Sequence, residues 1–291
     1  MSSSTLDPAA YLRTLLILGR TSNLPTVWSN CLAGWILGGE GDLKSLLLLS
    51  SGATMLYLGG MFLNDAFDED FDRQHRKERP IPSGQISANA VWAWGVGLLV
   101  VGMMPLMAIG QTSTVLTLFL IASILLYDAV HKAIAIAPVI MASCRFFLFL
   151  VAASAGIKGV TGTAIWCGLA LACYIVGLSF IARKESSRGA LQYWPCLFLG
   201  APAFLSIFLN AGPYATRGLI LSVLQIVWVV WCLQHAYWKA ERNIGYSVSG
   251  LLAGIVFVDL LAIAPQSIWL ALTFVLLFFA ARLFQRFVPA T

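Results

Sequence analysis

The residues of greatest chemical interest lie between positions 64 and 84, where five of the 13 acidic residues fall within eight positions. Asn64, Asp68 and Asp72 recur every fourth residue, so a helix would carry all three side chains along one face. Four basic residues follow directly: Arg73, Arg76, Lys77 and Arg79. Because Mg2+ prefers hard oxygen ligands together with phosphate oxygens, this segment predicts a site for Mg2+ and a diphosphate.

The rest of the chain is strongly apolar. Its 291 residues are 59% hydrophobic and 11% charged, with a mean hydropathy of +0.83, whereas soluble domains carry about 25% charged residues. A soluble protein would need more charge to cover its surface. We therefore expect an integral multi-pass membrane protein that has membrane lipid as a partner and no nucleic acid.

Ten apolar segments are separated by Gly, Pro, Asn or charged residues: 14–38, 45–66, 86–108, 112–131, 135–156, 162–182, 192–210, 216–238, 246–264 and 267–288. They predict an all-α transmembrane bundle in which residues 14–291 form one membrane-embedded domain. Residues 1–13 are a short cytoplasmic segment ahead of it. Glycines inside the apolar segments, among them Gly59 and Gly95, predict close packing of helices.

Lysine and arginine are concentrated in alternate loops, which predicts that these loops are cytoplasmic. The acidic cluster, His131 with Lys132, and the segment 183–185 would then open on the same side of the membrane. Such convergence predicts a site at one mouth of the bundle. The alternative is that each segment is simply a solvated loop. We expect a bacterial inner membrane, with an organelle membrane as the alternative.

The motif in the first loop resembles the first aspartate-rich motif of the UbiA superfamily of intramembrane prenyltransferases. The matching residues are Asn64, Asp68, Asp72, Arg79, Pro80, Ser83 and Gly84. The resemblance implies nine core helices around a cavity open to lipid, and the tenth apolar segment adds a helix at the C-terminus. It also implies an enzyme that uses Mg2+ to transfer a prenyl group from a prenyl diphosphate to a small-molecule or lipid acceptor, often aromatic.

The same resemblance implies roles for individual residues. Asn64, Asp68 and Asp72 would hold Mg2+ against the diphosphate, with Asp65 as an accessory ligand and Asp68 and Asp72 as catalytic residues. Arg79 and Arg76 would neutralise the diphosphate. Arg20 and Asn23 loosely resemble the start of the family's first helix, and we expect them to contact the diphosphate as well.

A second match is the segment from Tyr127 to Lys132, which is similar to the family's Tyr-xxxx-Lys segment. It implies that Lys132 supports the diphosphate and that Tyr127 lies near the reacting carbon, both as catalytic residues. The alternative is an interfacial tyrosine beside a lysine whose charge reaches the membrane surface. Arg145, within a predicted span, is expected either to pair with Asp128 or Asp259 or to contact an anion.

The segment 181–189 departs from the family, which usually has a second aspartate-rich motif there. Glu185 is its one acidic residue and is our expected further metal ligand, while Arg183 and Lys184 are expected on the diphosphate. Either these cations replace a metal ion, or the chemistry has been lost. In the second case the cavity would bind or transport a prenylated or isoprenoid lipid without catalysis. This departure is similar to the EboC-like branch of the superfamily.

Overall fold

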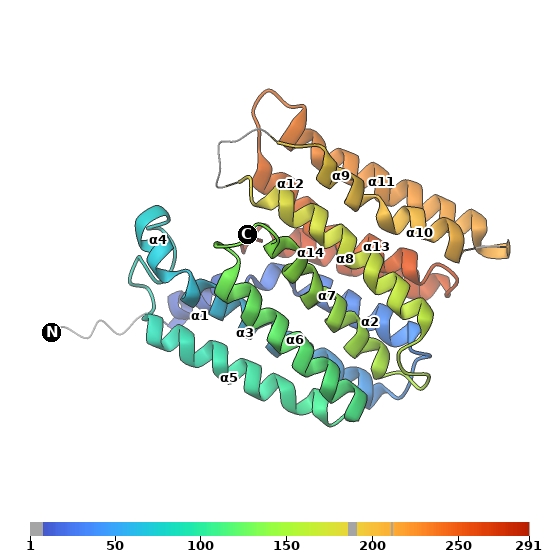
Figure 1. Cartoon of the computed structure of the whole chain (residues 1–291), viewed down its shortest axis with the longest axis horizontal. Helices are drawn as coiled ribbons and strands as arrows, with labels where there is room; N and C mark the ends of the chain where they lie inside the picture. Colours follow the sequence, from blue (N-terminus) through green and yellow to red (C-terminus); the bar gives the residue numbers. More distant parts are fainter. Residues whose placement is uncertain (1–7, 186–190, 211, 291) are drawn as a thin grey trace.

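The computed structural model describes residues 8–185, 191–210 and 212–290, and all regular structure within these ranges is helical (Figure 1). This confirms the predicted all-α bundle. The helices are α1 (Pro8–Leu18), α2 (Leu24–Leu37), α3 (Leu43–Phe67), α4 (Glu69–His75), α5 (Ala88–Met107), α6 (Gln111–Val130), α7 (Ala137–Ser154), α8 (Gly162–Ala182), α9 (Trp194–Leu199), α10 (Ala201–Leu209), α11 (Ala215–Tyr237), α12 (Ile244–Ala253), α13 (Ile255–Ala262) and α14 (Ile268–Phe284), with 3-10 turns at Thr21–Asn23 and Gly212–Tyr214.

Within the described ranges, seven helical segments are long and apolar enough to cross a membrane: Leu43–Phe67, Ala88–Met107, Gln111–Val130, Ala137–Ser154, Gly162–Ala182, Gly212–Tyr237 and Ile244–Ala262. Their outer faces expose large apolar side chains, such as Met104 and Leu219, which suits lipid as the surrounding solvent. The chain is thus a multi-pass membrane protein. The count of nine core helices and a tenth stays a prediction.

The first apolar segment is not one helix, so a continuous helix over 14–38 is wrong. α1 ends at Leu18, Arg20 adopts a left-handed backbone conformation (φ 41°, ψ 48°), and a 3-10 turn leads into α2. Pro25 in the first turn of α2 suits a helix start, where the missing N–H has no helical partner to lose. The break lets the side chain of Arg20 reach α3.

Helices α3 and α5 pack closely because small residues face each other between them. A Cβ atom on Gly59 would lie 2.9 Å from the carbonyl oxygen of Gly95, and one on Gly95 would lie 2.7 Å from Cγ of Leu63. Small residues allow helix backbones to approach in a membrane, where no hydrophobic effect drives helices together. The predicted close packing is confirmed at these glycines. This packing holds α3, the helix whose end carries the acidic cluster.

A polar network in the apolar core joins α2, α7 and α13. Arg145 Nη1 donates to Asn30 Oδ1 at 2.7 Å, and Asn30 Nδ2 donates to Asp259 Oδ2 at 2.7 Å. Ser29 Oγ donates to the same carboxylate oxygen at 2.5 Å. The asparagine thus bridges two opposite charges that the membrane interior would not tolerate alone. Of the two roles expected for Arg145, these contacts match the structural one, although the link to Asp259 passes through Asn30.

We expect Gly59→Val to destabilise the protein by about 1–3 kcal/mol, because the new side chain would force α3 and α5 apart. The check is thermal unfolding of the purified protein in detergent. Gly97→Ala, also on α5, is the control, since apart from its chain neighbours and the backbone of its own helix no atom lies within 4 Å of the position its Cβ would take. Equal melting temperatures for Gly59→Val and the wild type would show that this contact does not support the fold.

Candidate active site

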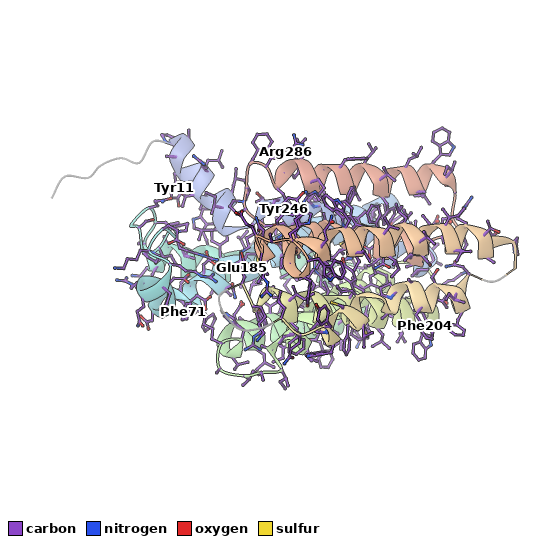
Figure 2. All side chains as sticks on the ribbon, turned by 90° about the horizontal axis from the view of Figure 1, so that it is seen from above. Tyr11, Phe71, Glu185, Phe204, Tyr246 and Arg286 are labelled. Carbon is purple, nitrogen blue, oxygen red and sulfur yellow. The ribbon has the colours of Figure 1, made fainter. Side chains whose placement is uncertain are left out.

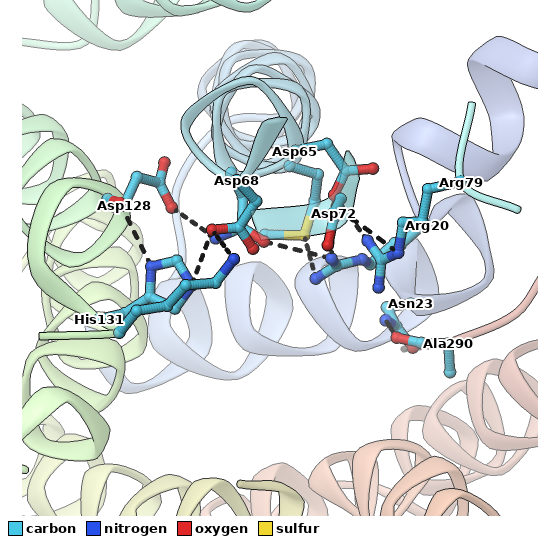
Figure 3. A network of polar contacts seen from close by, with 12 residues as sticks. Arg20, Asn23, Asp65, Asp68, Asp72, Arg79, Asp128, His131 and Ala290 are labelled. Atoms are coloured by element: carbon cyan, nitrogen blue, oxygen red, sulfur yellow. Dashed lines mark hydrogen bonds and ion pairs between the residues drawn. The ribbon is translucent and has the colours of Figure 1, made fainter. Parts of the chain in front are cut away.

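Five buried polar side chains gather at one end of the bundle. Asn64 and Asp65 lie on the last turn of α3, Asp68 lies between α3 and α4, Asp72 is in α4, and Asp128 is near the end of α6 (Figure 3). The chain forms two helices here rather than one. Backbone bonds from Asp68 N to Asn64 O (3.1 Å) and from Asp72 N to Asp68 O (2.9 Å) nevertheless keep the four-residue register through the junction.

Two arginines share one oxygen atom of Asp65. Arg20 Nη2 lies 3.2 Å and Arg79 Nη1 lies 2.9 Å from Asp65 Oδ1, and Arg79 Nε lies 4.0 Å from Asp72 Oδ2. Burial and the charge of Arg20 lower the pKa of Arg79. Gly84, with φ +76°, ends the turn that begins at Arg79. Planar guanidinium groups match phosphate oxygens, so this pair suits an anion at the same place.

Two basic side chains that directly follow α6 meet on Asp68. Lys132 Nζ lies 2.6 Å and His131 Nε2 lies 3.3 Å from Asp68 Oδ1. Burial opposes ionisation of Asp68, but the hydrogen bonds from His131 and Lys132 outweigh it and lower the pKa of the carboxyl. Lys132 Nζ also lies 3.8 Å from the centre of the Phe71 ring, a cation–π contact. The ring of Tyr127 stacks on His131 with 5.0 Å between the centroids.

Asp128 is not among the residues predicted for the site, yet the structure brings it there. Its Oδ1 accepts a hydrogen bond of 3.0 Å from Asn64 Nδ2. An aspartate within a predicted span was the available signal, since such residues face the bundle interior and are commonly functional. That signal does not identify the partner, and Asn64 is its partner rather than Arg145.

The donor atoms at this site fit Mg2+. Asp72 Oδ1 is buried and has no hydrogen-bond partner in the described part of the chain, so it can serve a cation. Burial raises the pKa of Asp72, and the charge of Arg79 opposes that rise. No three His, Cys, Asp or Glu side chains in the described ranges are already grouped around a metal position. Mg2+ does not require such a cage, because substrate phosphates and water complete its coordination.

Glu185 lies at the same end of the bundle as Phe71 and Tyr246, whereas Phe204 lies at the opposite end (Figure 2). Desolvation raises the pKa of the Glu185 carboxyl, and the charges of Arg76, Arg79 and Arg20 oppose the rise.

Two further residues that were predicted to contact the diphosphate donate hydrogen bonds to backbone carbonyls in this structure. Arg183 Nη1 donates to the carbonyl oxygens of Ile134 (3.1 Å) and Ala135 (2.8 Å), which closes the loop between α6 and α7. Asn23 Nδ2 donates to the carbonyl oxygen of Ala290 at 2.9 Å, which holds the C-terminal segment (Figure 3). Lys184 is half-buried after α8. The rest of the predicted second motif, residues 186–189, lies outside the described ranges.

We expect Asp65→Asn to lower the free energy of unfolding by about 2–4 kcal/mol, because Arg20 and Arg79 would then face each other without their shared counter-ion. Thermal unfolding at fixed detergent and salt measures it. Glu69→Gln is the control, since it removes an ion pair with the exposed Arg73, a type of pair that contributes about 0–1 kcal/mol. Equal effects of the two substitutions would contradict the expected importance of the Asp65 pair.

The chain matches the model of the UbiA prenyltransferase family over residues 22–287. The digeranylgeranylglyceryl phosphate synthase of Methanothrix thermoacetophila is 32% identical over 126 residues, which are 43% of this chain and 47% of that protein. The 4-hydroxybenzoate octaprenyltransferase of Idiomarina loihiensis is 29% identical over 97 residues, 33% of either chain. These matches span less than half of each relative.

A UbiA homolog from Archaeoglobus fulgidus bound to GPP and Mg2+ has the same fold, with a TM-score of 0.66 at 15% identity over 94% of this chain and 99% of that one.

Proposed function

The chain belongs to the UbiA prenyltransferase family, and we propose that it uses Mg2+ to transfer a prenyl group from a prenyl diphosphate to an acceptor within the membrane. The observation that carries this proposal is the buried cluster of Asn64, Asp68 and Asp72 with cations around it at one mouth of a membrane bundle. Hard oxygen ligands and cations on one surface suit a metal-bound diphosphate, which presents negative oxygens to both.

The side chains divide into two groups by charge. Asn64, Asp68 and Asp72 would hold Mg2+, which when bound neutralises part of the diphosphate charge. Arg20, Arg79 and Lys132 contact carboxylates in this structure and would contact the diphosphate in the complex. Fixed cations at that position stabilise the charge that develops on the leaving diphosphate.

Heterolysis of the carbon–oxygen bond leaves both electrons on the diphosphate oxygen and an allylic cation on the prenyl chain. A nucleophilic acceptor then supplies the electron pair for the new bond and loses a proton. The apolar helices around the site would exclude water, which otherwise would react with this cation. Tyr127 lies on the last turn of α6, with its ring stacked on His131, and is our candidate for contact with the reacting carbon.

The named relatives carry out different prenyl transfers and do not single out an acceptor. The concentration of basic residues around the site favours the cytoplasmic side of the membrane, and a bacterial inner membrane is our proposed location. The second candidate is a non-catalytic binder or transporter of an isoprenoid lipid. It is favoured by Glu185 being the one acidic residue of its segment and by the contacts of Arg183 with backbone carbonyls.

We expect Asp68→Asn to reduce Mg2+-dependent diphosphate release at least about 100-fold, a loss of about 2.7 kcal/mol of transition-state stabilisation. The measurement is diphosphate release from a panel of C5 to C20 prenyl diphosphates by protein in liposomes, with candidate acceptors added. Asp70→Asn, at an exposed position two residues away, is the matched control and should retain activity.

The wild-type result separates the two candidate functions. Release that depends on Mg2+ and on Asp68 supports prenyl transfer, and its length preference identifies the donor. Binding of a prenyl lipid without release, for every donor and acceptor tested, would replace the transferase with the binder or transporter.

A further inference from the structure

The amide group of Asn64 lies between two groups of opposite charge on different parts of the chain. Its Nδ2 donates to Asp128 Oδ1 at 3.0 Å, and its Oδ1 accepts from Arg20 Nη2 at 3.2 Å. A carboxylate accepts hydrogen bonds and a guanidinium donates them. Asp128 can therefore bond only to the NH2 group of the amide, and Arg20 only to its oxygen. The two ends have nearly the same shape, and the two neighbours alone therefore decide which end points where.

The orientation matters because the two ends differ as ligands. The amide oxygen has lone pairs for a cation, whereas the NH2 group presents hydrogen atoms and would repel it. Arg20 Nη2 also contacts Asp65 Oδ1 at 3.2 Å, so the oxygen of Asn64 faces the same space as the oxygen of Asp65. Asp128 occupies the opposite end, on the side of α6.

We propose that Asp128 is a positioning residue that fixes the Asn64 amide with its oxygen toward the divalent cation and the diphosphate. The inference rests on the function proposed above. Asp128 does not need to touch the substrate in this role, because it acts through the hydrogen bond to Asn64.

The register between α3 and α6 supports this role. Asn64 and Asp68 are four residues apart on one side, and Asp128 and Lys132 are four residues apart on the other. Asn64 pairs with Asp128, and Asp68 pairs with Lys132 at 2.6 Å. The end of α3 therefore meets the end of α6 and the turn after it through two complementary pairs, four residues apart on each side. The same register that brings Lys132 to Asp68 brings Asp128 to Asn64.

A purely structural role explains Asp128 less well. Asn64 is the hydrogen-bond partner of the Asp128 carboxylate through Oδ1. The other oxygen, Asp128 Oδ2, is buried without a partner among the described residues. His131 Nδ1 contacts the backbone oxygen of Asp128, not its side chain. A buried carboxylate with an unused oxygen is costly inside a membrane protein. An asparagine or a leucine would serve packing alone at lower cost.

The test uses Asp128→Asn and the reciprocal double variant, Asn64→Asp with Asp128→Asn. In the single variant the new amide at position 128 can present either its oxygen or its NH2 group to Asn64, so only Arg20 still orients the Asn64 amide. Once Arg20 contacts the diphosphate, as proposed above, the Asn64 amide is free to turn over. In the double variant the amide at position 128 would donate to the carboxylate at position 64, which leaves the other oxygen of that carboxylate for the cation. Ser123→Ala is the control on α6, since that hydroxyl donates to Phe119 O of its own helix at 2.8 Å.

The readout is binding of Mn2+ as a spectroscopic substitute for Mg2+, followed by electron paramagnetic resonance in the presence of a thiolo analogue of a C15 prenyl diphosphate. We expect Asp128→Asn to weaken Mn2+ binding at least about tenfold, the usual lower range for partners that orient a metal ligand. The double variant should bind within about threefold of the wild type, and Ser123→Ala should bind as the wild type does.

Equal Mn2+ binding by the wild type and Asp128→Asn would overturn the inference and leave the proposed function intact. Failure of a folded double variant to recover Mn2+ binding would also overturn the inference. If Asp128→Asn alone does not fold, the double variant provides the test. A wild type that binds the analogue but does not bind Mn2+ beside it would overturn the proposed function, and the inference with it.

Discussion

Compensation of buried charge is the constraint on which the site depends. Four carboxylates are buried at one mouth of a membrane bundle, and each can stay there only with partners. The partners come from separate segments: Arg20 from the break after α1, Arg79 from the turn after α4, and Lys132 from the end of α6. The left-handed backbone at Arg20 has a clear reason in this context, because the interrupted first helix places a cation where α3 needs one.

The apolar part of the molecule holds these charges in place. Gly59 and Gly95 bring α3 against α5, while Arg145, Asn30 and Asp259 tie α7 through α2 to α13. Neither set contacts the acidic cluster in the described structure, yet both limit where α3 and α7 can lie. Membrane helices lack a hydrophobic drive to associate, so close backbone approach and polar links supply the specificity.

The sequence predicts the chemistry of this chain better than its geometry. Four-residue spacing of Asn64, Asp68 and Asp72 identifies the cluster and its face, because that periodicity belongs to the helix itself. The break at Arg20 escapes prediction because a left-handed arginine has no local sequence signal. The pairing of Asp128 with Asn64 depends on the register between two helices distant in sequence. The contacts of Arg183 and Asn23 could not be predicted for a related reason, since backbone carbonyls that only the folded chain brings near them accept their hydrogen bonds.

The single oxygen of Asp65 that holds both arginines has a consequence for the end of a catalytic cycle. In this structure the oxygen contacts both guanidinium groups that the diphosphate of the proposed reaction would use. Arrival of the anion is then an exchange of one negative partner for another, and departure is the reverse exchange. If the proposed reaction takes place here, Asp65 would thus compete with the diphosphate product for the same two cations. Under the proposed function a resident competitor of this kind would weaken product inhibition, and its contacts give both arginines a counter-ion in this structure.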